Sequence, residues 1–361
     1  MNFDLDEQQQ AVAELAEQII GGQTTVERIK AAEAAQDFDR RLWSELAGAD
    51  LLGLCLAESA GGSGMGAVEL ALLCRAQGRH VIPAPLLATL ATAMVASEHG
   101  QDVSGVIAGS VVMTAALSEP GANLTDLPSL IAVAEGDGYR LRGERLSVPY
   151  GQHAGVVVVP ARVRGDVALF AVLTGGSGVT AEPISTTDRQ PAAHLTLDVL
   201  VPAACRFGDE AALTKLRQLW LTGQAATVLG VCEGALAMTA EYIRGRQQFG
   251  RPLATFQAAG HRAADAYITT EALRVAALSA AWQLDNGDDA AADVLIAAYW
   301  ASEGGQRVTL ATQHLHGGIG ADIDYPIHRR FLWATQLANS LGTVSSHLAE
   351  LGALIASGAP A

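Results

Sequence analysis

Aromatic residues, basic residues and cysteines are all scarce in this sequence. Only 5% of its 361 residues are Phe, Trp or Tyr, and 23 Lys and Arg stand against 38 Asp and Glu, a formal net charge of −15. Nucleic acids and anionic membranes bind clustered Lys and Arg, so this balance argues against either as the main partner. Half of the residues are hydrophobic, which excludes disorder as the dominant state.

The four cysteines lie far apart and form no CxxC pair: Cys55, Cys74, Cys205 and Cys232. Their spacing argues against a zinc site or a disulfide framework and predicts reduced, mostly buried thiols in a cytoplasmic protein. The first residues, MNFDLDEQQQ, lack the basic and apolar segments of a signal peptide. No run approaches the ~20 apolar residues of a membrane span, so we expect no membrane insertion.

Several catalytic motifs are also missing. The nine histidines form no HExxH or other metal-binding spacing, and no GxSxG marks a nucleophilic serine. The glycines of residues 316–320, HGGIG, follow a predicted helix rather than a strand, so they are not a Rossmann fingerprint. The sequence therefore predicts neither a metal centre nor a serine hydrolase.

The hydrophobic pattern changes near residues 109 and 208. Residues 1–109 and 209–361 show apolar residues at helical spacing. Residues 110–208 show short β-rich runs separated by Gly, Pro, Asp and Asn, which is typical of an antiparallel sheet or barrel. We therefore predict a mainly α protein with a central β domain: an N-terminal helical domain, a β domain and a C-terminal four-helix bundle. The predicted long helices span residues 211–244, 257–285, 288–314 and 331–355.

One basic segment interrupts the acidic sequence. Arg244, Arg246 and Arg251 lie within eight residues where one long helix is predicted to end and the next to begin. Arginines at a helix end beside a Gly/Pro turn suit a phosphate or pyrophosphate. The alternative is a solvated turn between helices. Residues 324–330, DYPIHRR, read most simply as a helix start.

These residues carry a family resemblance over nearly the whole chain. The segment 246–257, RQQFGRPLATFQ, followed by HRAAD at 261–265 and EALR at 271–274, resembles the acyl-CoA dehydrogenases. Weaker matches are LWSEL at 42–46, LGL at 52–54, GGSG at 61–64, SEP at 118–120, HGGIG at 316–320 and YP at 325–326. The family's order of helical domain, β domain and helical bundle agrees with the order read from the pattern.

The resemblance implies FAD as the cofactor, an acyl-CoA thioester as the substrate, and a flavin that lies at a subunit interface. Carried over by motif, Arg246 would pair with the pyrophosphate of a neighbouring subunit's FAD, and Gln248 would hydrogen-bond to it. Gly317 and Gly318 would admit the adenine side of the cofactor. The remaining cofactor-binding residues implied are Phe249, Leu253, Phe256, Gln257 and His314, the last standing where the family has Gln.

The parts of the motif nearest the reaction differ from the family. The catalytic Glu of the family's Tyr-Glu-Gly-Thr loop aligns with Leu341, and no acid lies near Trp220, where the family's other base position falls. The stretch beside the flavin reads SVP at 147–149, and the Gly-Ser-Asp after the Glu-Pro turn reads NLT at 123–125. A carboxylate is needed to remove the weakly acidic α-proton.

The chain thus resembles the base-lacking subunit of actinobacterial heterotetrameric acyl-CoA dehydrogenases, which act on steroid side chains and other bulky acyl-CoAs. Its expected partner is a homologous subunit that carries the catalytic Glu. One alternative is a self-sufficient homo-oligomeric dehydrogenase whose base is Asp322 or Asp324. Another is a non-catalytic acyl-CoA-binding or assembly protein without flavin.

Overall fold

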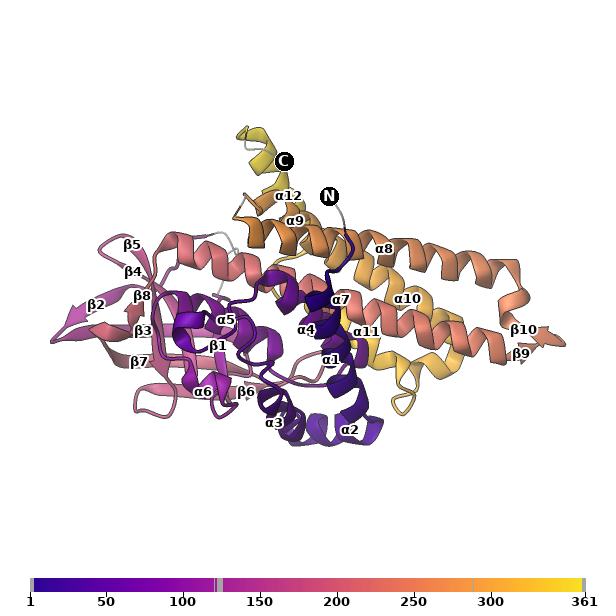
Figure 1. Ribbon diagram of the computed structural model, residues 1–361, viewed down its shortest axis with the longest axis horizontal. Helices are drawn as coiled ribbons and strands as arrows, with labels where there is room; N and C mark the ends of the chain where they lie inside the picture. Colours follow the sequence, from indigo (N-terminus) through magenta and orange to yellow (C-terminus); the bar gives the residue numbers. More distant parts are fainter. Residues whose placement is uncertain (1–2, 120, 122–125, 288, 359–361) are drawn as a thin grey trace. The chain divides into compact units, whose positions relative to one another are not determined.

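The computed structural model describes residues 3–119, 121, 126–287 and 289–358. By its internal contacts the chain forms two compact units. The helical unit consists of Met1–Glu27, Ala71–Ile82 and Leu221–Ala361, and the β unit of Arg28–Leu70 and Pro83–Trp220. The mainly α fold with a central β part and C-terminal helices is confirmed (Figure 1). The division into domains at residues 109 and 208 stays a prediction.

Two four-stranded sheets form the centre of the β unit. Their strand orders are β1-β4-β5-β8 and β2-β3-β7-β6. The strands are β1 (Met113–Ala115), β2 (Ala132–Glu135), β3 (Gly138–Pro149), β4 (Val156–Val163), β5 (Asp166–Leu173), β6 (Val179–Ile184), β7 (Ala192–Pro202) and β8 (Arg206–Phe207). All pairs are antiparallel except β1 with β4, which is parallel. Parallel neighbouring strands are usually joined by a helix. Here the connection from β1 to β4 runs instead through β2 and β3 of the second sheet.

The core of the β unit follows from its apolar strands and one apolar helix. Val158 and Val159 of β4 and Phe170 of β5 are at most 1% exposed. Helix α5 (Leu86–Glu98) is apolar on all sides, so it must be covered all round, and it packs against β1. The other helices of this unit are α2 (Val26–Ala35), α3 (Arg40–Gly48), η1 (Glu58–Ala60), α6 (Ser104–Ile107) and η2 (Ala203–Cys205).

The helical unit contains the C-terminal helices and α1 (Glu7–Gln23). Three helices have residues in both units: α2, α4 (Ala67–His80) and α7 (Glu210–Gly245). The remaining elements are β9 (Gln247–Gln248), β10 (Arg251–Pro252), η3 (Leu253–Thr255), α8 (Gln257–Asn286), α9 (Ala291–Tyr299), η4 (Trp300–Gly304), α10 (Gly305–His316), η5 (Gly317–Ala321), α11 (Ile327–Leu337) and α12 (Val344–Ala356). Helix α8 packs against α9 and α10, α10 against α11, and α9 against α12.

Two of the predicted long helices are interrupted. The helix predicted over residues 288–314 contains a π-helical segment, η4, between α9 and α10. The helix predicted over 331–355 was wrong as one element, because the chain leaves the helix between α11 and α12. Gly342 has φ +97°, and Thr343 starts α12 as an extended N-cap whose hydroxyl accepts the backbone N–H of Ser346. These local features stop one helix and start another.

Two sequence expectations concern buried groups. All four cysteines are free thiols, and Cys55, Cys74 and Cys232 are buried, as expected. Contrary to the expectation from the sequence, one helix among the described residues, α7, is long and apolar enough to cross a membrane, but 78% of its most apolar window is buried inside the protein. Such burial is typical of a core helix.

Candidate functional site

The predicted pyrophosphate-binding segment forms a small exposed hairpin between α7 and α8 (Figure 1). Strands β9 and β10 pair antiparallel, with Arg251 opposite Gln248. The tip consists of Phe249 (φ +53°) and Gly250 (φ +77°), the two consecutive left-handed residues that a tight hairpin turn requires. Phe249 is 92% exposed. A large aromatic side chain held in solvent at a hairpin tip suits contact with another molecule.

The arginines of this segment have different surroundings. Arg251 lies over the ring of Phe256, 4.2 Å from its centroid, and Arg244 donates from Nε to the carbonyl of Ala240 at 2.9 Å. Arg246 is exposed, and its guanidinium makes no hydrogen bond or ion pair with any residue that the structure describes. Its backbone N–H donates to Tyr242 O at 2.8 Å. The guanidinium of Arg246 is therefore available for an anion.

The other predicted cofactor residues of this segment continue into α8. Leu253 and Phe256 are half-buried, and the backbone N–H of Leu253 donates to Arg246 O at 2.9 Å, which closes the hairpin base. Gln248 and Gln257 are exposed. These residues form one continuous surface strip from the end of α7 to the start of α8.

The predicted glycine loop follows α10 as η5. Gly317 has φ +65° and ψ −146°, a conformation that is open essentially only to glycine. Gly317 and Gly318 are exposed, and a Cβ on either would meet no atom within 4 Å. His314, at the end of α10, is also exposed. The loop thus offers bare backbone at its surface.

A buried histidine anchors this loop. The His316 ring stacks on Tyr242 at 4.3 Å between centroids; its Nε2 lies 3.1 Å from Thr239 Oγ1 and its Nδ1 lies 2.9 Å from Tyr325 Oη. Desolvation, with a smaller contribution from the nearby charge of Arg330, lowers the pKa of His316 from 6.5 to about 4. The ring is therefore neutral at physiological pH.

Tyr242 connects the two segments. Its backbone carbonyl accepts the N–H of Arg246, its ring stacks on His316, and its hydroxyl donates to the His316 carbonyl at 3.3 Å. The end of α7 and the start of the glycine loop are thus held side by side. Sequence reasoning assigned Arg246 and the glycines but missed Tyr242, which lies between them.

The aligned base position holds an apolar side chain. Leu341 is 7% exposed and lies in the break between α11 and α12. Close by in sequence, His347 is 1% exposed, and neither ring nitrogen has a hydrogen-bond partner among the described residues. Burial lowers the pKa of His347. The alternative acids Asp322 and Asp324 are exposed, and Asp322 Oδ1 accepts the backbone N–H of Asp324 at 2.9 Å.

In the β unit the stretch 147–149 sits at an irregularity of β3. The pairing with β7 shifts register between Arg145 and Val148, and Ser147 has φ +47°. Ser147 is exposed and donates its backbone N–H to His194 Nδ1 at 3.2 Å. The NLT stretch at 123–125 and Pro120 lie outside the described residues.

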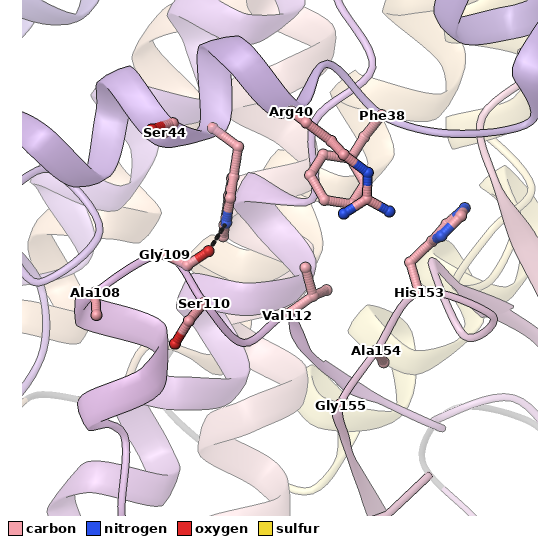
Figure 2. A pocket seen from close by; sticks show the side chains of 11 residues that line it. Phe38, Arg40, Ser44, Ala108, Gly109, Ser110, Val112, His153, Ala154 and Gly155 are labelled. Atoms are coloured by element: carbon pink, nitrogen blue, oxygen red, sulfur yellow. Dashed lines mark hydrogen bonds between the residues drawn. The ribbon is translucent and has the colours of Figure 1, made fainter. Parts of the chain in front are cut away.

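A surface pocket of about 290 Å³ also lies in the β unit, between α3, the residues after α6 and the start of β4 (Figure 2). Phe38, Arg40 and His153 face one another on one side of it, and the indole N–H of Trp43 donates to Gly109 O at 3.0 Å. None of the sequence-predicted site residues lines this pocket. It is therefore separate from the predicted cofactor contacts.

Comparisons with known proteins match both ends of the chain to one family. Residues 6–102 match the model of the acyl-CoA dehydrogenase N-terminal domain, and residues 222–353 match that of the C-terminal domain. The chain is 36% identical to the acyl-CoA dehydrogenase FadE27 of Mycobacterium tuberculosis, with 98% of each chain covered.

Two solved structures resemble the whole chain. A variant of the Tcur3481-Tcur3483 steroid ACAD is 43% identical, with 98% of each chain covered and a TM-score of 0.92. A chain of the ChsE4-ChsE5 complex from Mycobacterium tuberculosis is 36% identical, with 100% of each chain covered and a TM-score of 0.94. The similarity therefore includes the β part between the two matched domains.

Proposed function

The chain belongs to the acyl-CoA dehydrogenase family, and we propose that it is the base-lacking subunit of an FAD-dependent enzyme of this family. In this proposal the chain completes the FAD site of a homologous partner subunit. The partner supplies the catalytic Glu. The reaction is α,β-desaturation of an acyl-CoA thioester.

The exposed segments of the helical unit fit the pyrophosphate and adenosine portion of FAD. Arg246 offers a guanidinium that is not used by the described residues, and a planar guanidinium binds phosphate oxygens through two parallel hydrogen bonds. Gly317 and Gly318 leave empty the space that a side chain would fill. Phe249 and Phe256, whose rings are 6.1 Å apart, add apolar surface for the dinucleotide.

A bound FAD would supply a hydride acceptor for the β-carbon of the acyl group, and a carboxylate would be needed to remove the α-proton. The chain's own residues would bind and orient the cofactor: Arg246 and Gln248 at the pyrophosphate, Gly317 and Gly318 at the adenine side. Leu341 has no group that can take a proton. A missing general base costs about 10²- to 10⁴-fold in rate.

The observation that carries the proposal is the contrast between Leu341 and Arg246. The side chain at the base position is apolar and buried, whereas Arg246, Gln248 and Gln257 of the proposed cofactor set are polar and exposed. A self-sufficient enzyme needs both a general base and the residues that bind the cofactor. A subunit that only completes a neighbour's FAD site needs only the cofactor-binding residues.

The similar structures support a proposal for the kind of partner and substrate. One is described as a complex of ChsE4 with ChsE5, and the other as a steroid ACAD formed by Tcur3481 and Tcur3483. By analogy we propose a hetero-oligomer, and a steroid side chain or another bulky group as the acyl moiety.

Co-expression tests the proposal. The chain is produced alone and together with a homologous subunit that carries Glu in the aligned loop, and flavin absorbance and acyl-CoA dehydrogenation are measured. We expect little flavin and negligible turnover for the chain alone, and a yellow, active complex. Replacing the partner's catalytic Glu by Gln should abolish turnover and leave the flavin bound.

Two results would overturn the proposal in different ways. Robust turnover by the chain alone would favour a homo-oligomeric dehydrogenase, in which case Asp322→Asn and Asp324→Asn would identify its base. A complex without flavin would favour an acyl-CoA-binding or assembly protein.

A further inference from the structure

The hydrogen bonds around His316 have a direction that the structure determines. Thr239 Oγ1 lies 2.7 Å from the carbonyl of Ala235, to which only its proton can be donated. Toward His316 the same hydroxyl can therefore only accept. Nε2 of His316 must carry a proton, and in the neutral ring Nδ1 is left as an acceptor.

Tyr325 completes the chain of hydrogen bonds. Its hydroxyl lies 2.9 Å from Nδ1, so it donates to the lone pair there. The protons thus point one way, from Tyr325 to His316, from His316 to Thr239, and from Thr239 to Ala235. In a protonated His316 the Nδ1–H would instead donate to the Tyr325 hydroxyl, so the direction of this one hydrogen bond reports whether the ring is neutral. The low pKa of His316, about 4, agrees with a site built for the neutral ring.

The anchored histidine is adjacent to the residues that bind the cofactor. His316 directly precedes Gly317, and Tyr242, which stacks on it, accepts the backbone N–H of Arg246. His316 is 3% exposed, so its ring is shielded from direct contact with a surface ligand. Its influence on a ligand therefore acts through the segments that it holds.

We propose that His316 is a positioning residue of the flavin site, held in a single tautomer by Tyr325 and Thr239, and that it fixes the glycine loop relative to Arg246. This inference rests on the proposed function, because it assumes that Arg246 and the glycine loop bind one FAD. An anion and an adenosine that are covalently linked can be bound together only if their two binding segments keep a fixed spacing.

The first experiment observes the tautomer without flavin. The full chain is labelled with ¹⁵N-histidine, and the ring nitrogens of His316, assigned by comparison with His316→Phe, are observed near pH 7. We expect a protonated Nε2 and an unprotonated Nδ1. In Tyr325→Phe the Nδ1 resonance should shift because its donor is removed. An imidazolium, or a proton on Nδ1, would overturn the proposal.

The second experiment measures flavin retention in the complex. Tyr325→Phe removes one hydrogen bond and should weaken FAD binding about threefold to tenfold. His316→Phe keeps an aromatic ring against Tyr242 but loses both hydrogen bonds, and should weaken binding more. The matched control is Tyr299→Phe in α9, whose ring packs on Trp300; it should leave flavin retention unchanged. Thermal melts of each flavin-free variant report folding.

The outcomes separate this inference from the proposed function. If Arg246→Ala loses flavin while Tyr325→Phe and His316→Phe retain it, the positioning role is wrong and the proposed function stands. If Arg246→Ala also retains flavin, the assumption of a shared FAD site is wrong. If Tyr325→Phe and the control Tyr299→Phe lose flavin equally, the loss is not specific to the contacts of His316 and the positioning role is wrong.

Discussion

The guanidinium of Arg145 lies 2.9 Å from the carboxylate of Glu119, and the two side chains are only 2% and 8% exposed. Glu119 also accepts the backbone N–H of Ser129 at 2.8 Å, and Arg145 donates to the carbonyls of Glu144 and Pro160. Glu119 of the SEP segment is thus bound to strand β3 by a buried ion pair. The contact stabilises the β unit.

Glu119→Gln should strongly destabilise the β unit. The substitution leaves the buried guanidinium of Arg145 without its counter-charge, and breaking a buried pair in this way costs about 3–5 kcal/mol. The matched control is Glu135→Gln, which removes the partner of Arg140; the Glu135 side chain is 49% exposed, so its loss should change the stability little. Urea unfolding of both variants measures the difference; equal midpoints would contradict the structural role of Glu119.

Arg246→Ala should reduce FAD affinity of the complex by about 10- to 100-fold. A charge-assisted hydrogen bond contributes about 1.5–3 kcal/mol, and about 1.4 kcal/mol is a factor of ten. Arg246→Lys should restore binding only in part, because an ammonium lacks the planar fork. Flavin absorbance after gel filtration is the measurement. Arg244→Ala, two residues earlier and bonded to its own helix, is the control and should retain flavin.

Leu341→Glu should give little or no dehydrogenase activity in the chain alone. The new carboxylate enters a site that is 7% exposed, and SVP at 147–149 departs from the family's flavin-contact pattern. Burying a carboxylate without partners is also costly, so the melting temperature should fall. Leu341→Gln, of similar size and without charge, controls for the loss of packing. A large gain in turnover would show that the β-unit differences are harmless.

Stability should fall as the pH is lowered from about 6.5 toward 4. The pKa of His316 is about 4 in the folded chain, below its ordinary value of 6.5, and burial also lowers the pKa of His347. The unfolded chain therefore takes up protons that the folded chain does not, so these residues destabilise the fold below pH 6.5 and have no such effect above it. His316→Phe should show a shallower decline between pH 7 and 5 in urea unfolding. An identical slope would contradict the low pKa.

Local sequence patterns predicted α7 and α8 as single long helices, the β strands within residues 110–208, and the turn between the two helices that contains Arg246. Local patterns could not predict contacts between residues that lie far apart in the sequence. The partners of His316 at Thr239 and Tyr242 are more than seventy residues away in sequence, so their contact depends on how α7 and α10 pack. The break before α12 could have been read from Gly342 and Thr343, whose Gly-Thr pair is a stop and a cap.

The π-helical segment η4 determines which way α10 faces. A π turn accommodates one more residue than an α turn, and one residue of an α-helix corresponds to a rotation of about 100°. Deleting a single residue between Trp300 and Gly304 would therefore rotate His316 away from Thr239 by about that angle, even if every side chain in α10 were kept. The position of the glycine loop therefore depends on the number of residues in η4 as strictly as on the identity of any residue in the loop.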